Sequence, residues 1–407
     1  MAKLLCLGAL ISCGVAADDR TAQAQGTRGP AGANAADEAP TFRYDPNWPK
    51  PLPNSWTTGV IGGMFIDRND HVWLATRPET VTAMTETYAM EGLGDCCSPA
   101  PPVMELDQAG NVVQAWGPIH QTDPRTKKEV LVGKQGAPTV PVDVWPASEH
   151  MMYVDYKGNV WVSSQSRPSQ ILKFTHNGKF IKRFGTREAT SSADTANFAG
   201  PTGVYVDPRT NEAYVSDGYR NRRIIVFDAD TGAFKRMWGA YGKPPKDPQQ
   251  KDAFGSGVRM ADQFSVTHCI VPDNDGLLYV CDRINSRVQV FKKDGAYVRQ
   301  VVLGDPPKPG DKTHLGAAWY VAFSPDKEQR FMYVSDGTNK KIWIVRRRDM
   351  KILGAFGHGG RQGGQFETIH ILSVDSHGNI YTGETLSGNR VQRFLFTGMR
   401  PASAASK

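Results

Sequence analysis

The chain reads Gly203-Val-Tyr-Val-Asp207, Glu212-Ala-Tyr-Val-Ser-Asp-Gly218, Arg223-Ile-Ile-Val-Phe-Asp228 and Gly232-Ala-Phe-Lys-Arg-Met-Trp-Gly239 between residues 203 and 239, and this stretch decides its fold. Each of its four parts is a short run of β-branched and aromatic residues bounded by Gly, Asp or Asn, which is typical of β-strands joined by turns. The same order follows from His268 to Gly304. The repeating unit is therefore four strands over about forty residues.

Six such units can be traced along the chain. They cover residues 62–117, 150–185, 203–239, 268–304, 319–357 and 370–394. The sixth unit lacks a fourth strand, and Thr41-Phe-Arg-Tyr-Asp45 ahead of the first unit can supply it. A closed ring leaves no sheet edge open. The sequence therefore predicts an all-β, six-bladed β-propeller whose ring is closed by an N-terminal strand.

The N-terminal residues have the pattern of an export signal. Lys3 precedes the apolar run from Leu4 to Ile11, and Ala22-Gln-Ala24 is typical of a cleavage site, whereas Leu10-Ile-Ser-Cys13 resembles a lipobox that would acylate Cys13. We expect a periplasmic or extracellular protein, a lipid anchor at Cys13 being the alternative, with no membrane-spanning segment. The domains expected are a signal peptide (1–24), a disordered tether (25–40), the propeller (41–399, with an insertion at about 80–139 in its first blade) and a disordered tail (400–407).

Charge and cysteine content narrow the class of partner. The formal net charge is +7, but the basic cluster Arg346-Arg-Arg348 falls on an outer strand without interleaved aromatic residues, which argues against a nucleic-acid partner.

Export permits disulfides, and Cys269 and Cys281 fall on adjacent strands, as a bonded pair or as two buried thiols. Cys96 and Cys97 are neighbours and bond to each other only with strain. We expect a monomer.

Three histidines occupy one register of the repeat. His150, His268 and His370 each stand five residues ahead of an aspartate, in the second, fourth and sixth units. The matching positions of the other three units hold Gly62, Thr202 and Trp319. First strands line the axis of a propeller, so alternate blades direct three imidazoles to one point. The spacing predicts a three-histidine metal site with one position open, as in catalytic zinc sites.

The residues around these histidines resemble those of the peptidyl-α-hydroxyglycine α-amidating lyases, six-bladed propellers of the NHL-repeat class. The likeness covers about residues 55–396 and is strongest at Val215-Ser-Asp-Gly-Tyr-Arg-Asn-Arg-Arg223, at His268 with Val280-Cys-Asp-Arg-Ile-Asn-Ser-Arg287, and at His370 with Gly378-Asn-Ile-Tyr-Thr-Gly383. The resemblance implies that His150, His268 and His370 hold Zn²⁺. It also implies catalytic roles for Tyr219 as general base and Arg77 as a group binding the substrate carboxylate or Tyr219.

The implied reaction is cleavage of the C–N bond of an N-acyl-α-hydroxyglycine, giving an amide and glyoxylate. The expected substrate is a small molecule or peptide with an α-hydroxyglycine-like end. Two departures stand out: Ile371 replaces the family's acidic calcium-binding residue, which puts Ca²⁺ in doubt, and Arg220 replaces a family cysteine. Two alternatives stay open, a non-catalytic NHL propeller that binds a protein or ligand, and a metal-dependent lactonase-type hydrolase.

Overall fold

The computed structural model describes residues 38–81, 94–122, 129–132, 145–146, 148–247, 262–304 and 315–402. The predicted signal peptide and Cys13 lie outside these residues. Strand β1 begins at Glu38, inside the stretch expected to be a tether, and β28 runs to Pro401, inside the expected tail. Both ends of the propeller are therefore longer than the strand pattern of the sequence indicated.

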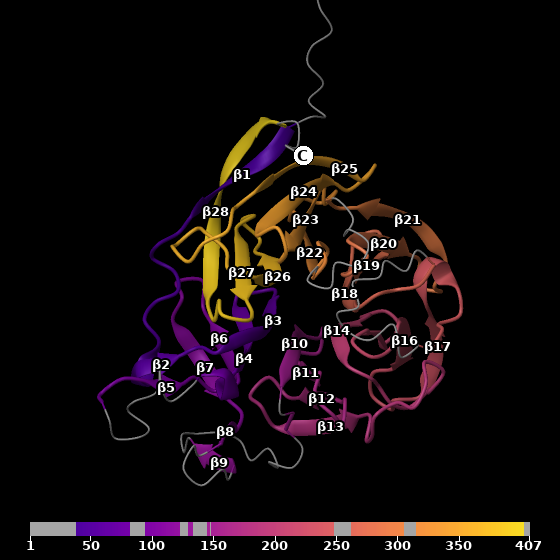
Figure 1. Ribbon diagram of the computed structural model, residues 1–407, viewed down its shortest axis with the longest axis horizontal. Coiled ribbons are helices and arrows are strands. Elements are labelled where there is room, and N and C mark those ends of the chain that lie inside the picture. The colour runs from indigo at the N-terminus through magenta and orange to yellow at the C-terminus, as the bar shows by residue number, and fades with distance from the viewer. Residues whose placement is uncertain are drawn as a thin grey trace, which may run out of the picture. The chain divides into compact units, whose positions relative to one another are not determined.

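Six four-stranded antiparallel sheets form the blades of a propeller (Figure 1). Blade 1 contains β3 (Val60–Ile66), β4 (Val72–Arg77), β6 (Val103–Leu106) and β7 (Val112–Trp116). Blade 2 contains β10 (Glu149–Val154), β11 (Val160–Ser164), β12 (Ile171–Phe174) and β13 (Phe180–Phe184). Blade 3 contains β14 (Pro201–Val206), β15 (Glu212–Asp217), β16 (Arg223–Asp228) and β17 (Phe234–Trp238).

The second half of the ring repeats this plan. Blade 4 contains β18 (Thr267–Pro272), β19 (Leu278–Asp282), β20 (Arg287–Phe291) and β21 (Tyr297–Val302). Blade 5 contains β22 (Tyr320–Phe323), β23 (Phe331–Asp336), β24 (Lys341–Arg346) and β25 (Lys351–Phe356). Blade 6 contains β26 (Ile369–Val374), β27 (Ile380–Glu384), β28 (Val391–Pro401) and β1 (Glu38–Tyr44). Short pairs outside the blades are β2 (Trp56–Thr57) with β5 (Ser98–Pro99), and β8 (Ile119–Thr122) with β9 (Glu129–Val132).

The ring closes as the sequence predicted. Strand β1 pairs antiparallel with β28 and completes the sheet of blade 6, so the first and last described strands are neighbours (Figure 1). Phe42 of β1 stacks on Phe356 of blade 5 at 4.9 Å between ring centroids. The closing strand is thus held by backbone pairing on one side and by aromatic packing on the other.

The core lies between neighbouring blades. The first strand of each blade is innermost (Figure 1), and its residues are mostly buried because sheets cover both faces. One apolar cluster joins blades 4 and 5, from Cys269 and Tyr279 to Val334 and Trp343. Outer strands such as β13 instead alternate between exposed and covered residues. This difference follows from their position, since an outermost strand faces solvent on its outer side.

The aspartates five residues after the histidines are turn residues. Asp155 accepts hydrogen bonds from the backbone N–H groups of Lys157 and Asn159 and from the indole N–H of Trp161. Asp375 does the same in blade 6 with His377, Asn379 and the hydroxyl of Tyr381. The constant spacing therefore measures the length of an innermost strand, from one mouth of the ring to the other.

Two disulfides are present among the described residues. Cys269 and Cys281 bond across β18 and β19, with Cα atoms 4.9 Å apart, which settles the alternative of two buried thiols. Cys96 and Cys97 also form a disulfide, although their adjacency in sequence argued against that pairing. The peptide bond between them is cis. In the described part of the chain, no helix has the length and apolar character needed to cross a membrane.

Candidate metal centre

Three imidazoles meet at one end of the ring's axis. His150, His268 and His370 are the second residues of β10, β18 and β26, and each is buried. Their ring centroids lie 4.8–5.1 Å apart, and the ligand atoms of all three lie within 4.8 Å of one another. The structure thus brings together the three histidines whose register the sequence showed.

A break in strand pairing aims each histidine at the axis. The register of β10 with β11 shifts between Glu149 and Met151, so His150 has no partner opposite it. The same shift occurs at His268 in β18 and at His370 in β26. A bulge of this kind turns a side chain away from the normal alternation of a strand. No residue pattern in the sequence announces these bulges.

Hydrogen bonds fix the tautomers of two imidazoles. Nδ1 of His268 donates to the carbonyl oxygen of Trp319 at 2.7 Å, and Nδ1 of His370 donates to that of Ile61 at 2.8 Å. A carbonyl oxygen only accepts, so Nδ1 carries the hydrogen and Nε2 keeps its lone pair. Nε2 of His370 faces Nε2 of His150 at 3.2 Å. Nδ1 of His150 is buried and has no partner among the described residues.

The electrostatic setting keeps the three rings neutral. Burial lowers the pKa of His370 to about 3, with the Arg77 guanidinium as a further cause. Burial also places the pKa values of His150 and His268 well below the usual range, with contributions from the neighbouring histidines and Arg283. Neutral imidazoles with free Nε2 atoms are the form that binds a metal ion.

Tyr219 points its hydroxyl at the histidines from blade 3. The hydroxyl oxygen lies 2.7 Å from Nε2 of His150 and 3.4 Å from Nε2 of His268. The residue follows β15, where its backbone N–H donates to the carbonyl oxygen of Gly200. The tyrosine singled out by the sequence motif is therefore in contact with two of the three rings.

Two glycines allow the backbone to approach this closely. A Cβ atom on Gly218 would lie 2.0 Å from the carbonyl oxygen of Thr267, next to His268. A Cβ atom on Gly62 would lie 2.2 Å from the carbonyl oxygen of Glu149, next to His150. Any side chain at these positions would push apart the strands that carry the ligands. This lack of space for a Cβ atom explains why blade 1 has a glycine at the position where blades 2, 4 and 6 have a histidine.

Arg77, the last residue of β4, reaches the same cavity. Its side chain is buried, and Nε donates to the carbonyl oxygen of Glu149 at 2.6 Å. In the register of the strands, Thr76 matches the acidic residues Asp217, Asp282 and Glu384, because each stands opposite the residue that precedes the bulge. Arg77, one residue further along, therefore matches Gly218 in blade 3 and Arg283 in blade 4. Burial and the carboxylate of Glu79 raise the pKa of Glu149 to about 8, so this neighbouring carboxyl does not neutralise Arg77 at neutral pH.

Arg283 is a residue that the sequence reasoning missed. It lies directly after β19, is buried, and places its guanidinium 4.4 Å from the ring centroid of Trp319 and 5.6 Å from that of Tyr219. The equivalent positions of blades 3 and 5 hold Gly218 and Gly337. The sequence did carry one signal for Arg283, namely a charged residue at a position that holds glycine in two other blades. Arginine keeps its charge even where burial lowers its pKa.

These residues surround one cavity of about 530 Å³. Its floor contains His370, Tyr219, Arg77 and Arg283, and apolar side chains including Leu315, Trp319 and Leu386 also line it. Two buried guanidinium groups give the floor a positive field that favours an anionic ligand. The cavity can therefore hold a carboxylate beside the three imidazoles.

The donor set fits a transition-metal ion better than calcium. Three neutral Nε2 atoms and a tyrosine oxygen are nitrogen-rich ligands of the kind that zinc prefers, whereas calcium takes oxygen ligands. The side chain of Ile371, the residue after the last histidine, packs in an apolar cluster with Ile61 and Met64. The triad is thus suited to bind a metal ion, and the calcium that the resemblance raised has no carboxylate at Ile371.

Comparisons with known proteins show which proteins this chain is similar to. No protein-family model matches the chain. It is 25% identical to peptidyl-glycine alpha-amidating monooxygenase B of Xenopus laevis over 369 residues, which covers 86% of this chain and 35% of that protein. It is 34% identical to peptidylglycine alpha-amidating monooxygenase of Rattus norvegicus over 155 residues, covering 37% of this chain and 14% of that protein. The chain thus spans about a third or less of the length of these relatives.

Two further similarities concern the repeat and the fold. NHL repeat-containing protein 3 of Mus musculus is 23% identical over 63% of this chain and 58% of its own length. A solved protein of unknown function from Bacteroides thetaiotaomicron superposes with a TM-score of 0.50 at 12% identity, over 88% of this chain and 76% of its own, which bears on the fold alone. The chain is therefore a distant homologue of the peptidylglycine alpha-amidating monooxygenases and of the NHL repeat proteins, with a six-bladed β-propeller fold.

Proposed function

We propose that this protein is a zinc-dependent carbon–nitrogen lyase that converts an N-acyl-α-hydroxyglycine into an amide and glyoxylate. One observation carries the proposal: the Tyr219 hydroxyl lies against a cluster of three buried imidazoles, and Tyr219, His370 and two buried arginines line one cavity. Distant homology to amidating enzymes supports the same reaction class. The two disulfides suit an exported protein, which we propose this one to be.

The reaction requires one proton to change place. The substrate R-CO-NH-CH(OH)-COO⁻ loses its hydroxyl proton, the carbon–oxygen bond becomes a carbonyl, and the carbon–nitrogen bond breaks. The leaving nitrogen takes up a proton, so the products are R-CO-NH₂ and glyoxylate. No oxidant, reductant or water is consumed. The protein must therefore hold the carboxylate, accept a proton from oxygen and return one to nitrogen.

Tyr219 is the group we assign to the proton transfer. Its hydroxyl oxygen is the atom that faces the imidazole Nε2 atoms, within the cavity that would hold the substrate. The guanidinium of Arg283 lies 5.6 Å from the centroid of its ring. A phenolate there accepts the hydroxyl proton, and the resulting phenol donates it to the leaving nitrogen. A single residue thus closes the proton cycle.

Arg77 and Arg283 are the groups we assign to the substrate carboxylate. Both are buried in the cavity floor, and a guanidinium fork matches the two oxygens of a carboxylate. Arg77 is held in place by the carbonyl oxygen of Glu149, one residue before His150. The carboxylate would therefore be fixed at a set position relative to the histidines.

His150, His268 and His370 are the residues that would hold zinc, through Nε2. When bound, zinc supplies a Lewis acid that lowers the pKa of a coordinated hydroxyl group. The hydrogen bonds from Nδ1 of His268 and His370 keep those rings oriented. The imidazoles carry no charge of their own, so they would leave the positive charge of a bound ion undiminished.

The proposal is tested by metal analysis together with product release. Purified protein is incubated with an N-acyl-α-hydroxyglycine, glyoxylate is measured, and zinc is determined per chain. Glyoxylate production that is lost on chelation and restored by zinc is the expected result. Metal binding without glyoxylate would refute the lyase assignment. Lactone hydrolysis supported by calcium would favour the hydrolase instead, and a protein that ignores both substrates and chelators would favour a binding propeller.

A further inference from the structure

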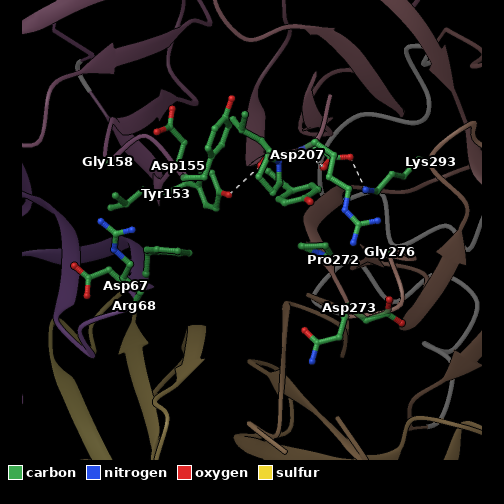
Figure 2. A pocket seen from close by; sticks show the side chains of 18 of the residues that line it. Asp67, Arg68, Tyr153, Asp155, Gly158, Asp207, Pro272, Asp273, Gly276 and Lys293 are labelled. Atoms are coloured by element: carbon green, nitrogen blue, oxygen red, sulfur yellow. Dashed lines mark hydrogen bonds and ion pairs between the residues drawn. The ribbon is translucent and has the colours of Figure 1, made fainter. Parts of the chain in front are cut away.

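A second group of metal-binding side chains lies at the opposite end of the innermost strands. There the turns after β3, β10, β14 and β18 surround a cavity of about 640 Å³, with Asp67, Asp155, Asp207 and Asp273 around it (Figure 2). Asp67 and His176 both line it. Since each histidine of the first site is five residues from such an aspartate, the two sites are a strand length apart.

Glu105 of β6 is the centre of this group. Its side chain is only 2% exposed, yet it faces two imidazoles: Nδ1 of His71 lies 2.7 Å from Oε1, and Nε2 of His176 lies 3.3 Å from Oε2. The two histidines come from different blades, His71 from the start of β4 and His176 from the turn after β12. Asp67 offers a further carboxylate, with its ligand atom within 4.8 Å of those of His71 and Glu105.

The charge of Glu105 is unusual for its place in the repeat. It pairs across the strands with Trp73, and the equivalent residues of blades 2 and 6 are Lys173 and Arg393. Each of those cations has a permanent counter-charge, Asp230 for Lys173 and Asp45 for Arg393. Among the described residues Glu105 has no lysine or arginine partner; its partners are the two histidines and the neutral amide of Gln114. A buried carboxylate needs positive charge, which here must come from protons or from a bound cation.

His71 also departs from the repeat at the same place. In blades 2 and 6 the equivalent residues are Asn159 and Asn379, whose side-chain amides donate to the turn aspartate. The backbone N–H of His71 keeps the bond to Asp67, but its ring turns to Glu105. Two departures from the repeat therefore converge on one point, where a third residue, His176, supplies another nitrogen.

We propose that His71, Glu105 and His176 form a second transition-metal site, which joins blades 1 and 2. Two imidazoles and a carboxylate are a common ligand set for Zn²⁺. Nδ1 of His71 contacts Oε1 of Glu105 at 2.7 Å and Nε2 of His176 contacts Oε2 at 3.3 Å, so an ion would be held by both oxygens of the carboxylate between the two imidazoles. The ring of His71 is 29% exposed and that of His176 is 53% exposed, so an ion can enter from solvent and keep a water ligand.

The negative charge at this site is that of Glu105 itself. Five aspartates line the adjoining cavity, but Asp207 is paired with Lys293, and Asp273 and Asp275 are paired with Arg347. Gln114 donates to Oε2 of Glu105 from β7 and holds the carboxylate in place. The site is structural in its position, since its ligands bridge two blades and lie away from the cavity that holds Tyr219.

Zinc stoichiometry tests this site independently of the proposed function. Protein stripped with a chelator is dialysed against Zn²⁺, freed of excess metal and analysed. We expect about two zinc ions in the wild type, and about one in each of the variants His268→Ala, His71→Gln and His176→Gln. The triple variant should retain none. The exposed residue His358, whose ring hydrogen-bonds only the carbonyl oxygen of Gly359 among the described residues, gives the control His358→Ala, which should keep both zinc ions.

A second readout guards against misfolding. Zinc should raise the melting temperature of His268→Ala, which keeps the second site, and this rise should disappear when His71→Gln and His176→Gln are added. Both histidines are partly exposed, and the glutamine at each position can still donate a hydrogen bond to Glu105. One zinc in the wild type that is unaffected by His71→Gln and His176→Gln would overturn the proposal. A second zinc that persists in the double variant would overturn it equally.

Discussion

The hydroxyl oxygen of Tyr219 lies 2.7 Å from Nε2 of His150, across the boundary between blades 3 and 2. The groups that we propose for proton transfer and for metal binding therefore sit side by side, although 69 residues separate them in sequence. Their contact depends on the close approach of backbone at Gly218 and Gly62. The distance between these two groups therefore depends on the absence of a Cβ atom at the two glycines as well as on the side chains themselves.

Replacing one histidine should remove the metal of the triad. In His268→Ala the remaining two imidazoles hold zinc at least about 100-fold more weakly, because losing a direct ligand exceeds the usual effect of losing an outer hydrogen bond. Glyoxylate release should fall with it. Equilibrium dialysis and circular dichroism check metal and fold separately. Normal metal affinity in this variant, measured with the Glu105 site also removed, would contradict the assignment.

Removing only the hydroxyl of Tyr219 should separate proton transfer from metal binding. We expect Tyr219→Phe to lower kcat by about 10²–10⁴-fold, the usual contribution of a general base. Zinc content and KM should change little, because the aromatic ring and the two arginines remain. The matched control is Tyr156→Phe, a tyrosine whose hydroxyl contacts Asn211 away from the cavity. Equal rates in both variants would exclude Tyr219 as the base.

The two arginines should differ from lysines in how they hold a carboxylate. Arg283→Lys keeps the charge but loses the fork, so KM should rise roughly 10- to 100-fold, as expected for one or two lost hydrogen bonds to a charged group. Steady-state kinetics with the α-hydroxyglycine substrate and with its amide-capped analogue measure the effect. The wild type should strongly prefer the free carboxylate, and Arg283→Lys should lose most of that preference. A variant that retains the wild-type preference would show that the carboxylate lies elsewhere.

A methyl group at Gly218 should disturb the site without touching a functional side chain. The added Cβ of Gly218→Ala would meet the carbonyl oxygen of Thr267 at 2.0 Å, so strands must shift at a cost of about 1–3 kcal/mol. We expect a lower melting temperature and a lower kcat. Gly359→Ala is the control, because its Cβ would meet only the Lys340 side chain at 3.4 Å. A Gly218→Ala protein as active and stable as Gly359→Ala would contradict the geometry.

Acid should destabilise the metal-free protein through the buried histidines. In the unfolded chain His370 binds a proton near pH 6.5, whereas in the folded protein burial lowers its pKa to about 3. The unfolded state therefore binds more protons between these values, so the free energy of unfolding falls as the pH drops from about 6.5 towards 3. Urea titrations at several pH values measure this. A free energy of unfolding independent of pH in this range would show that the histidines are not buried as described.

The repeat and the histidine register were readable in the sequence because strand length and blade order repeat with little variation. The histidines, the turn aspartates and the closing role of β1 all followed from counting. The contact of Tyr219 with two histidines did not follow from counting, because it depends on Gly200 and Gly218 bringing a loop against another blade. Counting places a residue on a strand but does not give the distance between blades.

Arg283 and Glu105 show what was missed. Each is a charged residue at a position where most other blades have a small or an apolar one, and a comparison of the six units column by column would have marked both. The bulges at the three histidines carry no such mark, since the same break occurs in β14 at Thr202 and in β3 at Gly62. Those are features of the innermost strands, set by backbone pairing and not by residue type.

The pairing of β1 with β28 also bears on the histidine triad. His370 lies in the blade that β1 completes, so the three imidazoles come together in a ring whose two end strands have paired. An ion held by the triad would therefore couple metal binding to closure of the ring.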